Sequence, residues 1–160
     1  MNVRAFRCRA LLAFAALLGC VHAAHADDDL RGLRLSLSPK YRQECATCHV
    51  AYPPGMLPAE SWQRLLNNLT RHFGADASLD AASLKELSAW LGNNAGTYRG
   101  AREAPPHDRI TASPWFRRKH DEVSAAAWKR PAVKSPANCS ACHARADQGD
   151  FNERNVRVPL

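Results

Sequence analysis

The chain has 160 residues, of which 46% are hydrophobic and 23% charged, and its formal net charge is +7 at pH 7. This length suits one globular domain rather than several. Beyond the N-terminal segment no stretch is apolar enough to cross a bilayer, so the composition argues against an integral membrane protein.

Residues 1–26 have the pattern of a secretory signal peptide. Three arginines precede an apolar run of nine residues at 11–19, and a small-residue cleavage site follows at 24–26. The apolar run is too short to span a membrane. We therefore predict an exported, periplasmic protein with a mature chain of 27–160. A lipoprotein signal ending at Cys20 is the alternative, although a bulky leucine stands where such signals usually carry a small residue.

The net positive charge is smaller in the mature chain. Three arginines leave with the signal peptide and no acidic residue does, so the formal charge falls by three, from +7 to +4. Such a small excess is weak support for nucleic-acid binding, and we predict no nucleic-acid partner.

The first predicted helix follows an irregular lead-in. Ser38 and Pro39 form an N-cap followed by proline at the first helical position. A short helix from there would deliver the cysteines and histidine of 45–49. The proline-rich segment 52–58 is predicted to be a loop.

Two longer helices are expected next. One opens at Pro58 and ends at Gly74, and the other starts after Asp80 and ends before Gly92. The first places His72 on its buried stripe, and the apolar residues at helical spacing in the two helices are Trp62, Leu65, Leu66, Leu69 and Phe73, then Leu84, Leu87 and Leu91.

The C-terminal half starts from a linker at 92–112, which is rich in glycine, proline and asparagine. Ser113 and Pro114 repeat the cap-then-proline pattern and open a helix that Pro131 stops. Its buried face carries Phe116, His120, Val123 and Ala127. A short extended segment is expected at 155–159.

The cysteines carry the strongest signal in the sequence. Two of the six lie in the signal peptide, and the remaining four form two Cys-x-x-Cys-His units. In this motif two thiols add to the vinyl groups of haem, and the adjacent histidine becomes the proximal iron ligand. We predict two covalently bound haem c groups held by Cys45, Cys48, Cys139 and Cys142, with His49 and His143 as proximal ligands. Four propionates would bring the net charge near zero.

Paired cysteines also occur in zinc sites and in redox-active proteins. Zinc sites usually combine a Cys-x-x-Cys pair with a distant pair of histidines rather than repeat compact triplets. Thioredoxin-like redox pairs use Cys-x-x-Cys without the adjoining histidine. The repeated triplet, which uses every mature cysteine, favours haem over both.

Each haem iron also needs a ligand on its opposite face, unless that position is open. His72 lies 23 residues after His49, and His120 lies 23 residues before His143. Both fall on apolar helical stripes, so we predict that they are the distal iron ligands. Pairing each with the motif nearest in sequence is the simpler arrangement, and a crossed pairing stays open.

Two weaker candidates for distal ligands remain. His107 lies in a Pro-Pro-His-Asp loop and is expected to be solvated. Met56 lies only seven residues past His49, which is too close to wrap around to the opposite haem face.

Aromatic and basic residues add less specific signals. The four tryptophans are expected to fill space beside the flat porphyrins rather than to relay electrons. The basic run Arg117, Arg118 and Lys119 precedes His120; it is either a solvated face or a partner for haem propionates or an acidic protein.

The sequence resembles the small bacterial dihaem cytochromes c that act as redox partners of the sphaeroides haem protein. The resemblance extends along nearly the whole mature chain. Its more telling stretches are His72-Phe-Gly-Ala-Asp76 and Trp115 to His120, because the haem motifs alone occur in many families. Further matching pieces are 45–49, Tyr52-Pro-Pro-Gly55, Leu57-Pro58, Ser61-Trp62, Leu69–Arg71, Arg109–Thr111, Trp128–Pro131, 137–143, Phe151 and Val158-Pro159.

The resemblance implies two bis-histidine haems of low potential. It also implies electron donation to another haem protein, often with a membrane b-type cytochrome upstream. His107 matches no position of the family pattern.

Together these observations predict a small, mainly α-helical c-type cytochrome, with short helices packed around two covalent haems and joined by long loops. A first-haem half would cover about 27–100 and a second-haem half about 101–160. We expect a monomeric electron carrier and not an enzyme. The alternatives are a peroxidase-like dihaem enzyme and a gas or redox sensor, each of which needs one displaceable axial ligand.

Overall fold

The structure is a computed structural model that describes residue 33 and residues 36–160. The predicted signal peptide and the alternative lipidation site lie outside these residues. Within them there is no strand, and no helix is long and apolar enough to cross a membrane. The mainly helical fold predicted from the sequence is therefore confirmed.

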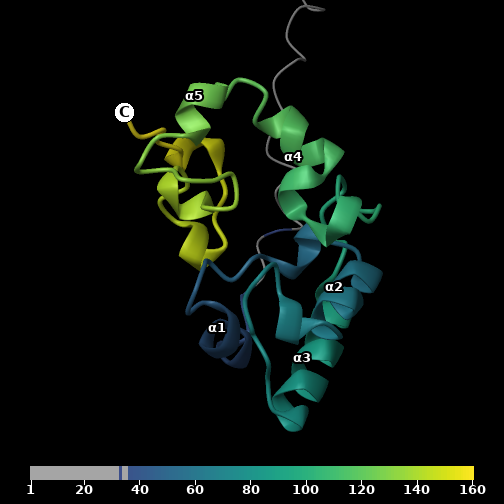
Figure 1. Cartoon of the computed structure of the whole chain (residues 1–160). Helices are drawn as coiled ribbons and strands as arrows, with labels where there is room; N and C mark the ends of the chain where they lie inside the picture. Colours follow the sequence, from purple (N-terminus) through teal and green to yellow (C-terminus); the bar gives the residue numbers. More distant parts are fainter. Residues whose placement is uncertain (1–32, 34–35) are drawn as a thin grey trace, which may run out of the picture.

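Five α-helices and several 3-10 turns make up the described chain, as Figure 1 shows. The α-helices are α1 (Pro39–Cys45), α2 (Ala59–Leu66), α3 (Ala81–Asn94), α4 (Pro114–Lys119) and α5 (Ala125–Trp128). The 3-10 turns are Pro54–Met56, Leu69–Arg71, Pro106–Asp108, Ile110–Ala112, Cys139–Ala141, Ala146–Gln148 and Glu153–Asn155. Helices α1 to α3 occupy one end of the molecule, and α4, α5 and the C-terminal segment occupy the other (Figure 1).

Local capping explains where three of the helices begin. The Ser38 side chain accepts from the Tyr41 amide at the start of α1, and Ser113 accepts from the Phe116 amide at the start of α4. Asp80 caps α3 by accepting from the amides of two following residues. Side-chain acceptors at this position satisfy amides that have no partner inside the helix.

Two predicted helices are shorter than the apolar pattern indicated. The helix expected to run from Pro58 to Gly74 ends at Leu66, and the chain continues through the 3-10 turn 69–71. The helix expected up to Pro131 breaks after Lys119 and restarts as α5. In both places the apolar spacing continues across a turn of the backbone.

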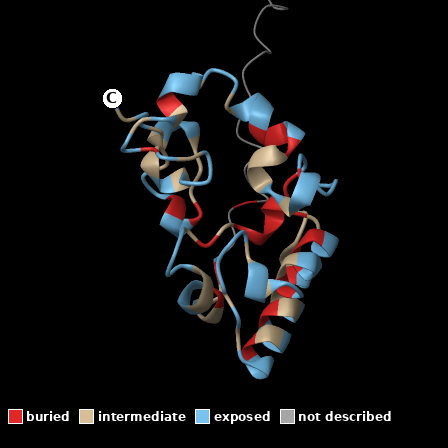
Figure 2. Cartoon of the chain, in the orientation of Figure 1, coloured by how far each residue is buried: buried red, intermediate tan, exposed pale blue. Residues whose placement is uncertain are grey.

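Two hydrophobic clusters form the core. The first joins α1, α2 and α3 and is built from Leu37, Tyr41, Ala51, Leu57, Trp62, Leu66, Leu87 and Leu91. The second surrounds the start of α4 and contains Leu33, Met56, Tyr98, Ala101, Trp115 and Phe116. Figure 2 shows buried positions on α2, α3 and α4 and in the segments between them, with exposed positions on other parts of the helices and in the loops. Two residues, Tyr52 and Ile110, pack against both clusters.

Candidate haem sites

Site 1 consists of Cys45, Cys48, His49 and His72. Helix α1 ends at Cys45, and the turn that follows presents Cys48 and His49 at the surface. The ring centres of His49 and His72 are 6.2 Å apart, and the two rings are tilted by only 25°. His49 Nδ1 lies 2.8 Å from the Val50 carbonyl oxygen.

A tight turn holds His72 in this position. The 3-10 turn 69–71 ends at His72, and the Ala75 amide donates to the His72 carbonyl at 3.0 Å. The two central residues, Phe73 and Gly74, have positive φ angles of 52° and 99°. Phe73 has a side chain and still adopts this left-handed conformation, which costs roughly 1–2 kcal/mol. Such strain is typical of functional sites.

Site 2 consists of His120, Cys139, Cys142 and His143. Helix α4 ends at Lys119, and His120 follows as its C-cap, with Nδ1 2.8 Å from the Phe116 carbonyl oxygen. The ring centres of His120 and His143 are 6.1 Å apart with an angle of 71° between the rings. Phe116 stacks on His120 with ring centres 4.0 Å apart.

The separation within each histidine pair fits a metal ion between the rings. Two metal–nitrogen bonds of about 2 Å, with the distance from each nitrogen to its ring centre, account for a separation of about 6 Å. Ligating histidines usually donate their second ring nitrogen to a carbonyl, as His49 and His120 are placed to do. The residues present therefore fit two haem irons.

Site 2 opens into a cavity of about 700 Å³ between α4, α5 and the C-terminal segment. Its walls are largely aromatic and aliphatic, and both histidines and both cysteines of site 2 line it. Met56 reaches this cavity from the N-terminal half, where it belongs to the second hydrophobic cluster. An apolar cavity of this kind suits a porphyrin.

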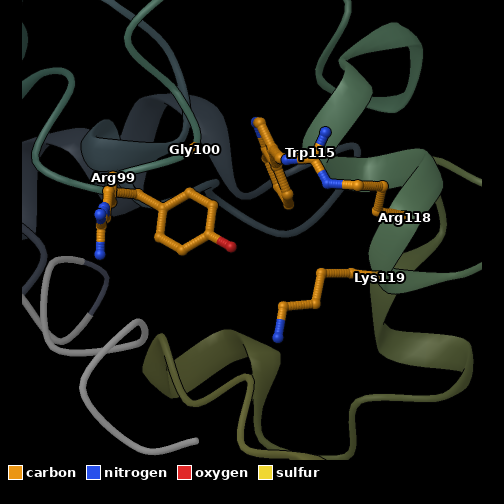
Figure 3. A pocket seen from close by; sticks show the side chains of 6 residues that line it. Arg99, Gly100, Trp115, Arg118 and Lys119 are labelled. Carbon is orange, nitrogen blue, oxygen red and sulfur yellow. The ribbon is translucent and has the colours of Figure 1, made fainter. Parts of the chain in front are cut away.

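A second cavity of about 330 Å³ adjoins the first (Figure 3). Lys119 reaches into it from α4, and Arg99 stands on the opposite wall. Its other lining residues are Tyr98, Gly100, Trp115 and Arg118, so the described lining holds three cations and no acidic residue. This charge suits the propionate carboxylates of a haem in site 2. Arg117, the remaining member of the basic run, is exposed and does not line this cavity.

None of the four described cysteines is in a disulfide. Burial raises the pKa of Cys45 and of Cys139 to about 11. Redox-active Cys-x-x-Cys pairs instead depend on a lowered thiol pKa. No group of three or more metal-binding side chains suited to an ion such as zinc occurs among the described residues. The structure therefore supports neither a zinc site nor a thioredoxin-like redox pair at these cysteines.

Burial also lowers the pKa of one histidine in each pair. For His72 the neighbouring His49 adds to the effect of burial, and for His143 the neighbouring His120 does. The lowered pKa favours the neutral imidazole, which is the form that binds metals.

The structure places the sequence-predicted residues as follows. It brings His49 together with His72, and His120 together with His143, which is the pairing that is local in sequence. His107 is exposed in the turn Pro106–Asp108 and belongs to neither pair. Sequence reasoning assigned no role to Tyr52, which stacks on His49 with ring centres 4.7 Å apart. Its position three residues after the motif histidine was the available signal.

Comparisons with known proteins agree with this geometry. The family described as "Dihaem cytochrome c" matches residues 41–151. The structure resembles that of DHC from Rhodobacter sphaeroides at 44% sequence identity, with a TM-score of 0.63, covering 73% of this chain and all of the other. A diheme cytochrome type c from Shewanella baltica matches at 36% identity and a TM-score of 0.66, covering 76% of this chain and 92% of the other. No curated protein matches the chain. The chain therefore belongs to the dihaem cytochrome c family and carries two covalently bound haem c groups.

Proposed function

We propose that this protein is a periplasmic electron carrier in which both haem irons have two histidine ligands. The observation that carries the proposal is the spacing of the two histidine pairs, 6.2 Å in site 1 and 6.1 Å in site 2. The haems supply one-electron exchange between ferric and ferrous iron. The chain supplies the ligands, the apolar walls and the charges around them.

The ligand pairs favour a carrier over a catalyst. With a histidine on each face, neither iron offers a position for peroxide, oxygen or another substrate until a side chain leaves. Family members are typically electron carriers, in line with this arrangement. A dihaem peroxidase or a gas sensor would need one open or weakly held axial position.

A low reduction potential follows from the same residues. Histidine in place of methionine as the second ligand favours ferric iron. The carbonyl contacts of His49 and His120 make these imidazoles more basic, which acts in the same direction. The cations Arg99 and Arg118 would oppose the trend at site 2 by offsetting propionate charge, and Lys119 would contribute less because it pairs with Glu153 at 3.5 Å.

The proposed electron acceptor is another haem protein, with a membrane b-type cytochrome as the donor. The exposed cations at the end of α4 offer a docking surface for an acidic partner, beside the cavity of site 2. Association steered by such charges is fast and weakened by salt. The signal-peptide pattern supports a location in the periplasm.

The test mixes the reduced protein with a candidate haem partner in a stopped-flow instrument, at low and high salt. Carbon monoxide and peroxide are tested separately. We expect fast, salt-sensitive electron transfer, no stable carbon monoxide adduct and no multiple-turnover peroxide reduction. Arg118→Gln should slow transfer at low salt, whereas Lys85→Gln, which removes an equal charge from α3, should not. A stable carbon monoxide adduct in the unmodified protein would contradict the carrier function and would favour the enzyme or sensor alternative.

A further inference from the structure

The two haem sites lie in different halves of the chain, and one side chain links site 1 to the loop that leads into site 2. Tyr52 stacks on His49 of site 1, with ring centres 4.7 Å apart and an angle of 20° between the rings. Its hydroxyl donates to the Ala137 carbonyl at 2.8 Å, a contact between residues 85 positions apart. Ala137 stands two residues before Cys139, which anchors the haem of site 2.

The Tyr52 backbone is fixed as well. Tyr41, buried in the first cluster, donates from its hydroxyl to the Tyr52 carbonyl at 2.9 Å. Tyr52 itself packs against both hydrophobic clusters. It is therefore held by the N-terminal core at its backbone, by site 1 at its ring and by the site 2 loop at its hydroxyl.

We infer that Tyr52 is a positioning residue that fixes the mutual position of the two haem sites, through its ring on His49 and its hydroxyl on the loop before Cys139. Electron exchange between two centres depends steeply on their separation, so a fixed separation gives a uniform exchange rate. The inference rests on the two covalent haems of the family and needs no partner protein.

The matched pair Tyr52→Phe and Tyr41→Phe tests this role. Each variant removes one hydroxyl that donates to a backbone carbonyl, at 2.8 and 2.9 Å. Of these two hydroxyls, only that of Tyr52 reaches from the first half of the chain to the second, which the Arg64–Asp108 ion pair and the second hydrophobic cluster also join. Tyr41→Phe should lower stability at least as much as Tyr52→Phe, because the Tyr41 hydrogen bond is part-buried, whereas water can replace the exposed Tyr52 donor.

The readout is the iron–iron distance distribution, measured by pulsed dipolar EPR on the frozen, fully ferric protein with both haems attached. For Tyr52→Phe we expect a broader distribution, with intramolecular electron exchange several-fold slower by NMR of half-reduced samples. For Tyr41→Phe we expect the unmodified distribution and rate. The inference is overturned if Tyr52→Phe keeps the unmodified distribution, or if both variants broaden it equally. Because the distance readout involves no acceptor, it stands whether or not the proposed partner is correct.

Discussion

The two distal histidines are not held equally, which predicts that an added ligand displaces one before the other. His120 Nδ1 lies 2.8 Å from the Phe116 carbonyl oxygen and donates to it when Nε2 is free to bind iron. His72 Nδ1 is buried and has no hydrogen-bond partner among the described residues. His72 also follows the strained route through Phe73, whereas His120 directly follows the last turn of α4.

The size of the difference follows from the extra hydrogen bond. One such bond contributes about 1 kcal/mol net, which corresponds to about a fivefold difference in an equilibrium constant. Cyanide should therefore replace His72 at a concentration about fivefold lower than that needed to replace His120. Release of strain in the turn after His72 would widen the gap.

The assay is a cyanide titration of the ferric protein followed by EPR, in which each low-spin signal disappears at its own midpoint. The variants His72→Ala and His120→Ala, each with one open iron, assign the two signals. Equal midpoints, or earlier loss of the site 2 signal, would refute the reasoning. So would either variant that keeps two low-spin haems, because the assignment of distal ligands would then be wrong.

The remaining predictions concern spectra, pH and packing. The ferric protein should show two different EPR signals. The near-parallel histidine rings of site 1, at 25°, should give a rhombic signal, and the near-perpendicular rings of site 2, at 71°, should give a highly anisotropic one. Two identical signals would contradict this geometry. The Arg64 guanidinium, which donates to the Asp108 carboxylate, holds the pKa of that carboxyl below its usual value. The contact therefore stabilises the fold at pH values above the ordinary carboxyl pKa, and this stabilisation disappears as pH falls through the lowered pKa of the folded state. In chemical denaturation, the free energy of unfolding of Asp108→Asn should depend less on acid pH than that of the unmodified protein. Asp80→Ala should lower the free energy of unfolding by about 1 kcal/mol through loss of the α3 cap, with both haem spectra unchanged. A Cβ at position 100 would lie 2.8 Å from the Trp115 Cβ, so Gly100→Ala should destabilise the fold by roughly 1–3 kcal/mol and alter only the site 2 spectrum.

Much of the local structure could be predicted because short-range chemistry determines it. The serine–proline pairs at 38–39 and 113–114 and the cap at Asp80 each satisfy amides within a few residues, and all three helices start where these signals stand. The two cysteine motifs could also be identified from the sequence, because haem attachment fixes their spacing. These features need no knowledge of the tertiary structure.

The helix ends could not be predicted from apolar spacing, because a buried stripe can continue across a break in the backbone. Asn67 ends α2 and a 3-10 turn then delivers His72, although the spacing of Leu65, Leu69 and Phe73 suggests one continuous helix. Ser124 caps α5, and this serine was the local signal for the break between α4 and α5. The role of Tyr52 depends on a contact 85 residues away, which no local pattern contains.

The shortness of the helices has a consequence for the life of the protein in the cell. Isolated helices of fewer than about 12 residues are marginal in water, and among the described α-helices only α3, with 14 residues, is longer; α1, α2, α4 and α5 have seven, eight, six and four residues. The second hydrophobic cluster gives α4 part of a core, but the cavity of about 700 Å³ beside α4 and α5 leaves the rest of the segment after the linker to pack on its porphyrin. A chain released without that group would present an open, protease-sensitive C-terminal region, while α1 to α3 would still share the first hydrophobic cluster. Steady-state abundance should accordingly follow the capacity of the attachment machinery, so that a shortage of porphyrin removes the polypeptide instead of leaving an inactive pool.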